Sequence, residues 1–507
     1  EFRPRALFER FNIALLATWY TWIGLISAAQ PVEGKLAAMP PPRFGERVLV
    51  FAPHEDDETL GTAIYARRAI AAGAQVYVCL MTAGEGEELG AALLTKRPPV
   101  SPRAFFRLGQ ARQRETLRAM AQIGLPKSHV IFLDYPNMGL QRLWSAANWS
   151  PRSPLVSPYT KVATVSFDGS FRVGAPFCGA SVLSDVEAVM EQVQPTQVFT
   201  AHPADIHSDH WPTYCFVKLA LTELRTRGES SWARPCRLYT YLVHRRGWPS
   251  PWGYYPELSL MPPPALVDLP VNRWLGLSLT PDEIATKNRM ILTYRSQLAR
   301  FDMLLRAFSR GTEIYGEVLD VRLMPEDLAT QGVFLEPTAD SASIRKRPYA
   351  DLSQVDLWTD GRELEIKIHT LAPQIRNVRM QAIVHLVDPA TDSVRVLEVE
   401  VRPGTSPQFT GATDTAGVSA LTGAGLRARS DGDTAIVRVP YFLLGSGQPV
   451  MVDIVTKLNR RTVDHSITRL VYLPAAKDQP AEVAPTSPAG VNTAAPAHVP
   501  TTDASTK

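Results

Sequence analysis

Short apolar runs alternate with amphipathic stretches over the first half of the chain. Four of these runs have the length and composition of buried strands, and three stretches between them have helical spacing. Alternation at this spacing is typical of a parallel sheet with right-handed crossovers. We therefore expect an α/β fold with a Rossmann-like, doubly wound, mostly parallel sheet. The expected strands are Val48–Ala52, Val76–Leu80, Val130–Asp134 and Gln197–Ala201, and the expected helices are Thr59–Ala72, Phe105–Ile123 and Ser184–Val193.

The pattern changes after about residue 338. Leu364, Ile366 and Ile368 alternate strictly with polar residues, and several further short strands follow without helices between them. Such a pattern is typical of an all-β sandwich-like domain, which we place at residues 340–475. We expect this domain to act as a spacer or a docking module and to be separable from the first. The Pro-, Ala- and Thr-rich residues 476–507 predict a disordered tail.

Composition narrows the class of protein. The chain has 507 residues, of which 45% are apolar, so it is long enough for two or three domains with real cores. A net charge of +3 gives no indication of a nucleic-acid partner. The four cysteines form no C-x-x-C pair, and in an oxidising compartment Cys178 and Cys236 could form a disulfide.

The N-terminal segment indicates where in the cell the protein is located. Phe11–Ala29 carries no charge over 19 residues, and arginines precede it. At about 1.5 Å per residue such a helix nearly crosses a hydrocarbon core, and the arginines favour an inner amino terminus. Ser27–Ala29 also resembles a small-residue cleavage site. We expect residues 1–35 to be a signal peptide or membrane anchor, which places the protein in the cell envelope, periplasmic or extracellular. The alternative is a buried amphipathic helix.

Candidate chemistry gathers at two strand ends. Pro53–Glu58 follows the first expected strand and holds one imidazole and several carboxylates, and His202–His210 follows the fourth with three histidines. Charged groups at such positions cost solvation and gain no packing. In open α/β sheets, ligands bind at the carboxyl ends of strands. Two clusters of this kind favour a binding site over the simpler interpretation, in which Asp56 or Asp57 caps a helix.

The residue types indicate a metal centre. One His and one Asp from the first strand end and one His from the second would supply three protein ligands. A fourth position would stay open for water, as in catalytic zinc sites. A carboxylate then remains beside the metal as general base. The same ligand types suit Fe²⁺, so the ligands alone do not fix the metal.

The segments Pro53–Glu58 and His207–His210 resemble the motifs of the PIG-L/LmbE-like family of zinc-dependent de-N-acetylases. The resemblance spans roughly residues 47–318, and the deacetylase domain is expected at residues 45–335. The chain departs from the family pattern at Glu55, where Pro or Ser is usual. It implies an N-acetylated sugar as substrate. By this resemblance, the metal ligands are His54, Asp57 and His210, Asp56 is the general base, His207 stabilises the tetrahedral intermediate or protonates the leaving amine, and Asp209 orients an imidazole.

Two further positions follow the family pattern less closely. Arg112 stands on a predicted helix and is a candidate for contact with substrate, although it could equally pair with Glu115. Asn137 stands where many relatives have an aspartate near the sugar hydroxyls. The resemblance predicts a hydrolase that removes the N-acetyl group from an N-acetylglucosamine-type sugar of an envelope glycan or glycoconjugate. The alternatives are a catalytically silent glycan-binding module and an amidase for a larger acyl group.

Overall fold

The structure, a computed structural model, describes residues 36–95, 100–270, 272–324, 332–337, 347–388, 393–412, 425–444, 449–459 and 461–474. The expected signal peptide or anchor at residues 1–35 and the expected tail at residues 476–507 lie outside the described residues. Within these ranges, no helix is both long and apolar enough to cross a membrane. The four cysteines are free thiols, and all are buried.

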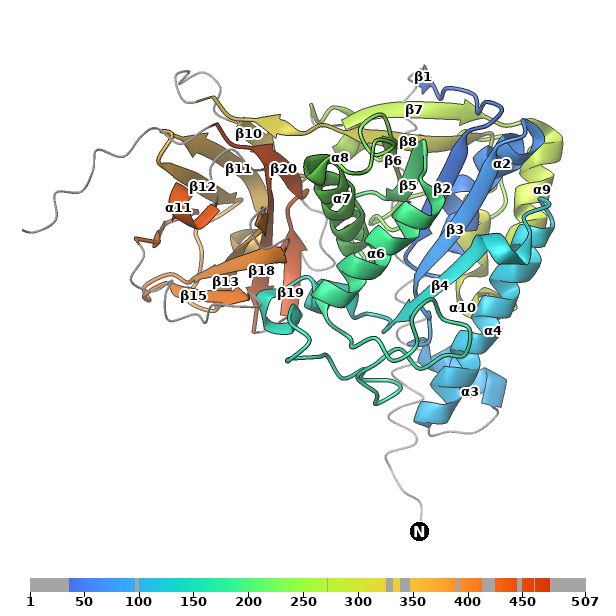
Figure 1. The fold of residues 1–507 in the computed structure, drawn as a ribbon, viewed down its shortest axis with the longest axis horizontal. Coiled ribbons are helices and arrows are strands. Elements are labelled where there is room, and N and C mark those ends of the chain that lie inside the picture. Colours follow the sequence, from blue (N-terminus) through green and yellow to red (C-terminus); the bar gives the residue numbers. More distant parts are fainter. Residues whose placement is uncertain are drawn as a thin grey trace, which may run out of the picture.

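The first half of the chain folds around an eight-stranded sheet (Figure 1). Its strands are β1 (Ala37–Ala38), β2 (Arg47–Ala52), β3 (Gln75–Thr82), β4 (Val130–Tyr135), β5 (Gln197–Ala201), β6 (Arg237–Tyr241), β7 (Asn272–Ser278) and β8 (Thr312–Val318). The spatial order is β1-β7-β8-β6-β5-β2-β3-β4. The strands from β2 to β6 pair in parallel, and β8 pairs antiparallel with β6 and β7. The predicted mostly parallel sheet is therefore confirmed.

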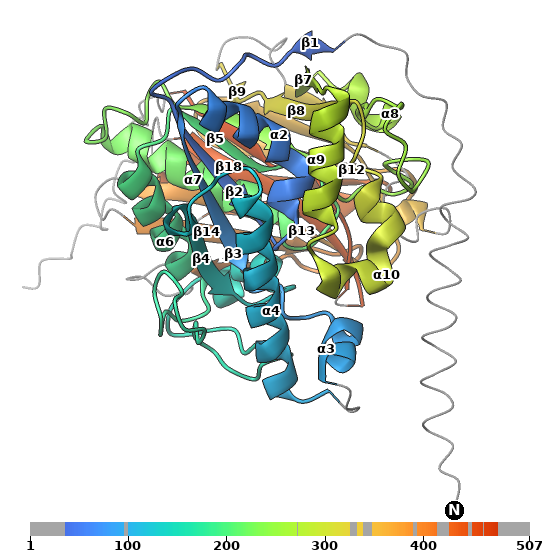
Figure 2. The same cartoon turned by 90° about the vertical axis from the view of Figure 1, so that its right-hand side faces the viewer.

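Helices cover both faces of this sheet (Figure 2). The helices are α2 (Asp57–Ala71), α3 (Glu88–Thr95), α4 (Pro102–Ala121), α5 (Leu140–Leu143), α6 (Gly179–Val193), α7 (His210–Arg227), α8 (Pro264–Val267), α9 (Pro281–Ile291) and α10 (Arg295–Arg306). Val48 and Val50 of β2 pack into the core beneath α2, α4 and α9. Leu49 and Phe51 point the other way, into the core beneath α6 and α7. The strand is apolar throughout because both of its faces are buried.

The order of the strands fixes where a ligand site should lie. From β2 the chain moves outward to β3 and β4, and it then returns to place β5 and β6 on the other side of β2. The topology switches between β2 and β5, and the crevice at such a switch is where open α/β sheets bind ligands. The two histidine-containing segments of the sequence follow these two strands.

The second half of the chain forms two further sheets, of five and seven strands (Figure 1). The strands are β9 (Val321–Arg322), β10 (Gly332–Leu335), β11 (Leu352–Thr359), β12 (Glu363–Thr370), β13 (Val378–Asp388), β14 (Ser393–Val401), β15 (Gln408–Ala412), β16 (Arg427–Asp431), β17 (Thr434–Pro440), β18 (Pro449–Leu458), β19 (Arg461–His465) and β20 (Arg469–Tyr472), with one helical turn, α11 (Tyr441–Leu444). Side chains of both sheets share one apolar core. We call this unit the β domain and the first half of the chain the α/β domain.

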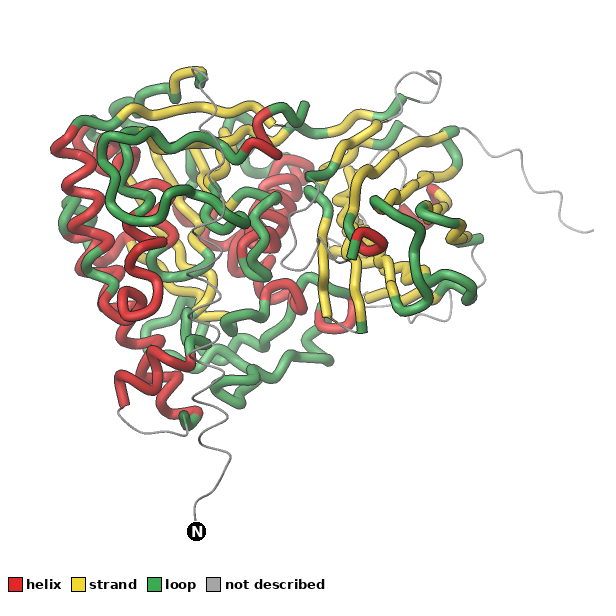
Figure 3. Tube along the Cα trace, turned by 180° about the vertical axis from the view of Figure 1, so that it is seen from behind, coloured by secondary structure: helices red, strands yellow, loops and turns green. Residues whose placement is uncertain are grey.

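The β domain packs directly on the α/β domain. In β18, Val450 and Val452 point into the core between the two β sheets, whereas Met451 and Val455 join the core that surrounds α6 and α7. β18 is thus buried on both faces. Figure 3 shows the strands of its sheet beside the helices of the α/β domain. The two domains share a core, which argues against a separable β domain, and its separability stays a prediction.

Candidate active site

The two predicted strand ends meet at the switch point. His54 lies just after β2, and Asp57 is the first residue of α2. His210 is the first residue of α7, shortly after β5. A carboxylate is favoured at a helix N-terminus because the helix dipole is positive there. All three side chains are buried.

Three candidate ligand atoms from these residues face one another. The Oδ2 atom of Asp57 lies 3.1 Å from Nδ1 of His54 and 3.1 Å from Nε2 of His210. The two nitrogens lie 3.2 Å apart. Tetrahedral zinc with bonds of about 2.0 Å has ligand atoms about 3.3 Å apart. The residues therefore fit a small divalent metal ion.

A carboxylate holds the far nitrogen of each imidazole. Oδ2 of Asp209 lies 3.0 Å from Nε2 of His54, and Oδ2 of Asp205 lies 3.0 Å from Nδ1 of His210. Such partners orient a histidine and raise its basicity toward a metal. The family resemblance assigns this orienting role to Asp209. The role of Asp205 was not predicted from the sequence, although Asp205 lies in the same histidine-rich segment.

Burial and ion pairing compete in setting the charges of this cluster. Burial lowers the pKa of His54, but hydrogen bonds with Asp209 and Asp57 outweigh it and raise that pKa to about 9. The pKa of His210 likewise lies well above its usual value, because Asp205 and Asp57 outweigh burial. For Asp57, burial raises the pKa, but His210 and His54 lower it well below the usual range. These shifts favour protonated imidazoles beside an ionised Asp57 carboxylate.

Asp56 stands beside the three residues with an unusual backbone. Its φ of 132° lies in a region that non-glycine residues rarely adopt, and strain of this kind gathers at functional sites. Burial raises the pKa of Asp56 to about 7, although Arg112 lowers it. A carboxyl group with a pKa near neutrality suits a general base.

Two further imidazoles face the cluster. The ring of His207 lies 4.7 Å from that of His54 and 4.9 Å from that of His210. Nδ1 of His207 accepts a hydrogen bond from the Asp209 amide at 3.2 Å, so its proton is on Nε2. Burial and the neighbouring histidines keep the pKa of His207 well below its usual value. His207 is therefore a neutral hydrogen-bond donor.

His244 is the second of these imidazoles, and the sequence analysis missed it. Its ring lies 4.5 Å from that of His210, three residues beyond the end of β6. Burial and His210 lower the pKa of His244 to about 4. The sequence around it carries no motif, and only the placement of β6 beside β5 brings it to the site.

Two alternative groups of potential ligands overlap this cluster, namely His54 with His207 and His210, and Asp57 with His210 and His244. Their ligand atoms lie within 4.8 Å of one another, which is looser than the spacing of 3.1–3.2 Å found above. Because the tighter group matches the edge of a zinc tetrahedron, we favour His54, Asp57 and His210.

The two candidate substrate residues are buried. Arg112 hydrogen-bonds the carbonyl oxygens of Gly84 at 2.9 Å and Glu55 at 2.7 Å, and it also pairs with the Glu55 carboxylate at 3.3 Å. It therefore supports the loop that carries His54. The backbone N–H of Asn137 donates a hydrogen bond to the carboxylate of Glu85 at 3.1 Å. The Asn137 residue is only 8% exposed.

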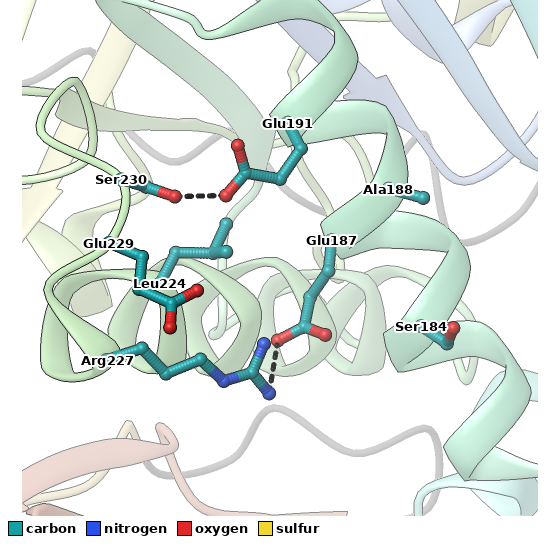
Figure 4. A pocket seen from close by; sticks show the side chains of 8 residues that line it. All are labelled: Ser184, Glu187, Ala188, Glu191, Leu224, Arg227, Glu229 and Ser230. Atoms are coloured by element: carbon teal, nitrogen blue, oxygen red, sulfur yellow. Dashed lines mark hydrogen bonds and ion pairs between the residues drawn. The ribbon is translucent and has the colours of Figure 1, made fainter. Parts of the chain in front are cut away.

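A separate cavity of about 390 Å³ lies between α6 and α7 (Figure 4). Arg227 pairs with Glu187 at 3.4 Å there, and Ser230 hydrogen-bonds Glu191. The lining includes none of the predicted site residues. The lining residues are Ser184, Glu187, Ala188, Glu191, Leu224, Arg227, Glu229 and Ser230.

The fold and the site define a doubly wound α/β domain with a histidine–aspartate cluster at its switch point. Residues 49–221 match the PIG-L family, described as GlcNAc-PI de-N-acetylase. This stretch contains both strand ends of the site. The chain therefore carries a PIG-L family domain, as its motifs predicted. No curated protein sequence matches the chain.

Several solved structures are similar at low identity. The conserved protein TT1542 from Thermus thermophilus is 20% identical over 56% of this chain and 100% of its own, with a TM-score of 0.33. The N,N'-diacetylchitobiose deacetylase from Pyrococcus horikoshii is 16% identical over 59% of this chain and 88% of its own, with a TM-score of 0.34. A 4-carboxy-2-hydroxymuconate hydratase from Pseudomonas putida is 16% identical over 52% of this chain and 83% of its own, with a TM-score of 0.32. At these values the similarities carry no argument about activity.

Proposed function

We propose that the protein is a metal-dependent hydrolase that removes the N-acetyl group from an N-acetylglucosamine-type sugar. The triangle of His54, Asp57 and His210 carries this proposal, because its ligand atoms are spaced 3.1–3.2 Å apart, as a divalent ion requires. The PIG-L family match supports a de-N-acetylase. Enzymes of this family are typically metal-dependent, and we propose zinc, with Fe²⁺ as the alternative.

The roles of the remaining residues follow from their positions. A bound zinc ion supplies Lewis acidity and lowers the pKa of water to near neutrality. Asp56, whose pKa is raised to about 7, accepts the proton of the attacking water. His207 donates a hydrogen bond from Nε2–H to the attacked carbonyl oxygen, where negative charge develops. The proton that Asp56 accepts passes to the leaving amine as the C–N bond breaks. Asp205 and Asp209 keep the His210 and His54 rings in place.

The substrate proposal is an N-acetylated amino sugar within an envelope glycan or glycoconjugate. The description of the matching family, GlcNAc-PI de-N-acetylase, supports a linked N-acetylglucosamine. The direct test is acetate release from a panel of N-acetylglucosamine conjugates, with and without chelator. Release that chelator stops and added Zn²⁺ restores would support the proposal. Binding of the conjugates without any acetate release would instead favour a glycan-binding module.

We also propose that the protein works in the cell envelope. The support is the uncharged run Phe11–Ala29 behind three arginines. When the full chain is expressed in a bacterial host, the protein should fractionate with membranes or periplasm. Recovery of uncleaved protein in the cytoplasm would contradict this location.

A further inference from the structure

We infer that the β domain helps to build the metal site, with His465 at the end of β19 as a positioning residue for the loop that carries His207 and His210. This inference rests on the proposed metal site. It concerns a part of the chain that lies outside the matched PIG-L stretch of residues 49–221.

His465 contacts the loop at two points. Its Nε2 lies 3.1 Å from the carbonyl oxygen of Asp205, and its Nδ1 lies 3.0 Å from the carbonyl oxygen of Ser466. Because a carbonyl only accepts, a neutral ring donates to one of these two oxygens and a protonated ring donates to both. The His465 ring also stacks on Trp211, with centroids 5.0 Å apart and planes inclined by 21°. Trp211 directly follows His210 in α7. One side chain of the β domain therefore contacts both sides of the segment between Asp205 and Trp211.

Asp205 connects the His465 contact to the histidine–aspartate cluster through its own carboxylate. Besides holding Nδ1 of His210 at 3.0 Å, its carboxylate accepts the amides of His207 at 3.0 Å and His244 at 2.8 Å. Asp205 is fully buried. Three of the imidazoles at the site thus depend on where the backbone of Asp205 lies, and His465 binds that backbone.

The same strand also contacts the segment that holds Asp209. Oγ1 of Thr462 in β19 accepts a hydrogen bond from the Gln141 side chain at 2.6 Å. The backbone of this segment donates to the Asp209 carboxylate, from Met138 at 2.6 Å and from Leu140 at 2.9 Å. Because the contact of Thr462 with Gln141 is exposed, it is the weaker of the two. β19 therefore contacts the segment that contains Asp205 and also the segment whose amides hold the Asp209 carboxylate.

The β domain can keep His465 in place because it is packed firmly on the α/β domain. β19 pairs with β18, and Met451 and Val455 of β18 belong to the core shared with α7. A displacement of β19 would have to disturb that core.

The test uses the full chain with three substitutions. His465→Phe keeps an aromatic ring against Trp211 but removes the donor. His465→Gln keeps a donor of similar reach and removes the ring. His369→Phe is the matched control, because His369 is a half-buried imidazole of the β domain that pairs with Asp356 at 3.0 Å on the other β sheet.

Two measurements decide the question. Competition with a chelator gives Zn²⁺ affinity, and hydrogen exchange of the metal-free protein reports the amides of His207 and Asp209. Replacing an outer partner of a metal ligand typically costs about 10- to 100-fold in affinity. We expect a loss of about tenfold for His465→Phe, with faster exchange at both amides. His465→Gln should recover most of the affinity, and His369→Phe should behave as the parent.

The inference is overturned if His465→Phe matches the parent in both measurements, or if the control variant changes equally. Should His465→Phe fail to fold, Thr462→Val provides the same test at an exposed position, with a smaller increase in exchange around Asp209 expected and parental exchange contradicting the inference. Neither measurement uses substrate. A parent protein that binds Zn²⁺ but releases no acetate would therefore refute the deacetylase proposal alone. If the parent binds no Zn²⁺, exchange in the metal-free chain still decides the part played by His465.

Discussion

The Nε2 atom of His210 lies 3.2 Å from the Nδ1 atom of His54, although 156 positions separate the two residues in the chain. Both nitrogens also lie 3.1 Å from one oxygen of Asp57. Two imidazole nitrogens and a carboxylate oxygen at such distances need a cation among them, either protons or a metal ion. Asp209 and Asp205 hold the opposite nitrogens, so the rings cannot easily turn away.

Replacement of His210 by Ala should remove most of the bound metal. The change deletes one of three proposed ligands and leaves Asp205 without its imidazole partner. We expect elemental analysis of the purified variant to show well under one zinc ion per chain. His369→Ala is the control, because it removes a histidine distant from the site. Full zinc content in His210→Ala would rule out this residue as a ligand.

Replacement of Asp56 by Asn should have the opposite profile. Asn is similar in size but does not accept a proton at neutral pH. Loss of general-base help typically reduces the rate by about 10²- to 10⁴-fold. We expect a fall in kcat of that size while zinc content stays at the parental level. Near-normal turnover in this variant would exclude Asp56 as the base.

Replacement of His207 by Ala tests the proposed oxyanion donor. A donor that acts mainly in the transition state contributes to kcat and little to binding. Removing one such donor typically costs about 10²- to 10³-fold. Zinc content and KM should change little, and acetate release should fall. If zinc is lost instead, His207 is a ligand, as the wider group with His54 and His210 would allow.

The two strand ends of the site could be predicted from the sequence because each is marked by residues that are neighbours in the chain. An apolar run such as Val48–Ala52 that ends in His54 identifies a strand and its carboxyl end without any knowledge of other strands. The same holds for Gln197–Ala201 before the second histidine cluster. The family motifs then indicated which residues should bind metal.

The missed features depend on long-range packing. His244 follows β6 without any motif, and it reaches the site only because β6 pairs with β5. The contact of His465 with Asp205 spans 260 positions. The shared core was missed because alternation along β18 gives way to a continuous buried run, Pro449–Thr456, and such a run does not reveal which partner covers its second face.

The interface between the domains should weaken in acid through His385. This buried ring stacks on Trp144, with centroids 3.6 Å apart, and burial lowers its pKa to about 3. The unfolded chain takes up this proton below about pH 6.5, whereas the folded protein does not until about pH 3. Stability from this group is therefore complete above pH 6.5 and is lost as the pH falls from 6.5 to about 3.

The measurement is chemical denaturation at pH 8 and pH 5. His385→Phe keeps a stacked ring that cannot titrate, so it should lose less stability between the two pH values than the parent, by roughly 2 kcal/mol. His369→Phe should lose as much as the parent. An equal loss in His385→Phe and the parent would show that His385 does not limit acid stability.

Removal of the β domain should expose the apolar face that it covers. A chain that ends at Glu336 would leave Trp149, Trp211 and Phe216, together with neighbouring residues of that core, without the side chains of β13, β14 and β18 that pack on them. Exposed apolar patches of several hundred Å² favour aggregation. We expect this truncated protein to be recovered mainly as aggregates in size-exclusion chromatography. A chain shortened only by residues 475–507 is the control and should elute as the parent does. A monodisperse protein that ends at Glu336 and binds zinc as tightly as the parent would contradict both the structural need for the interface and the inferred part of His465.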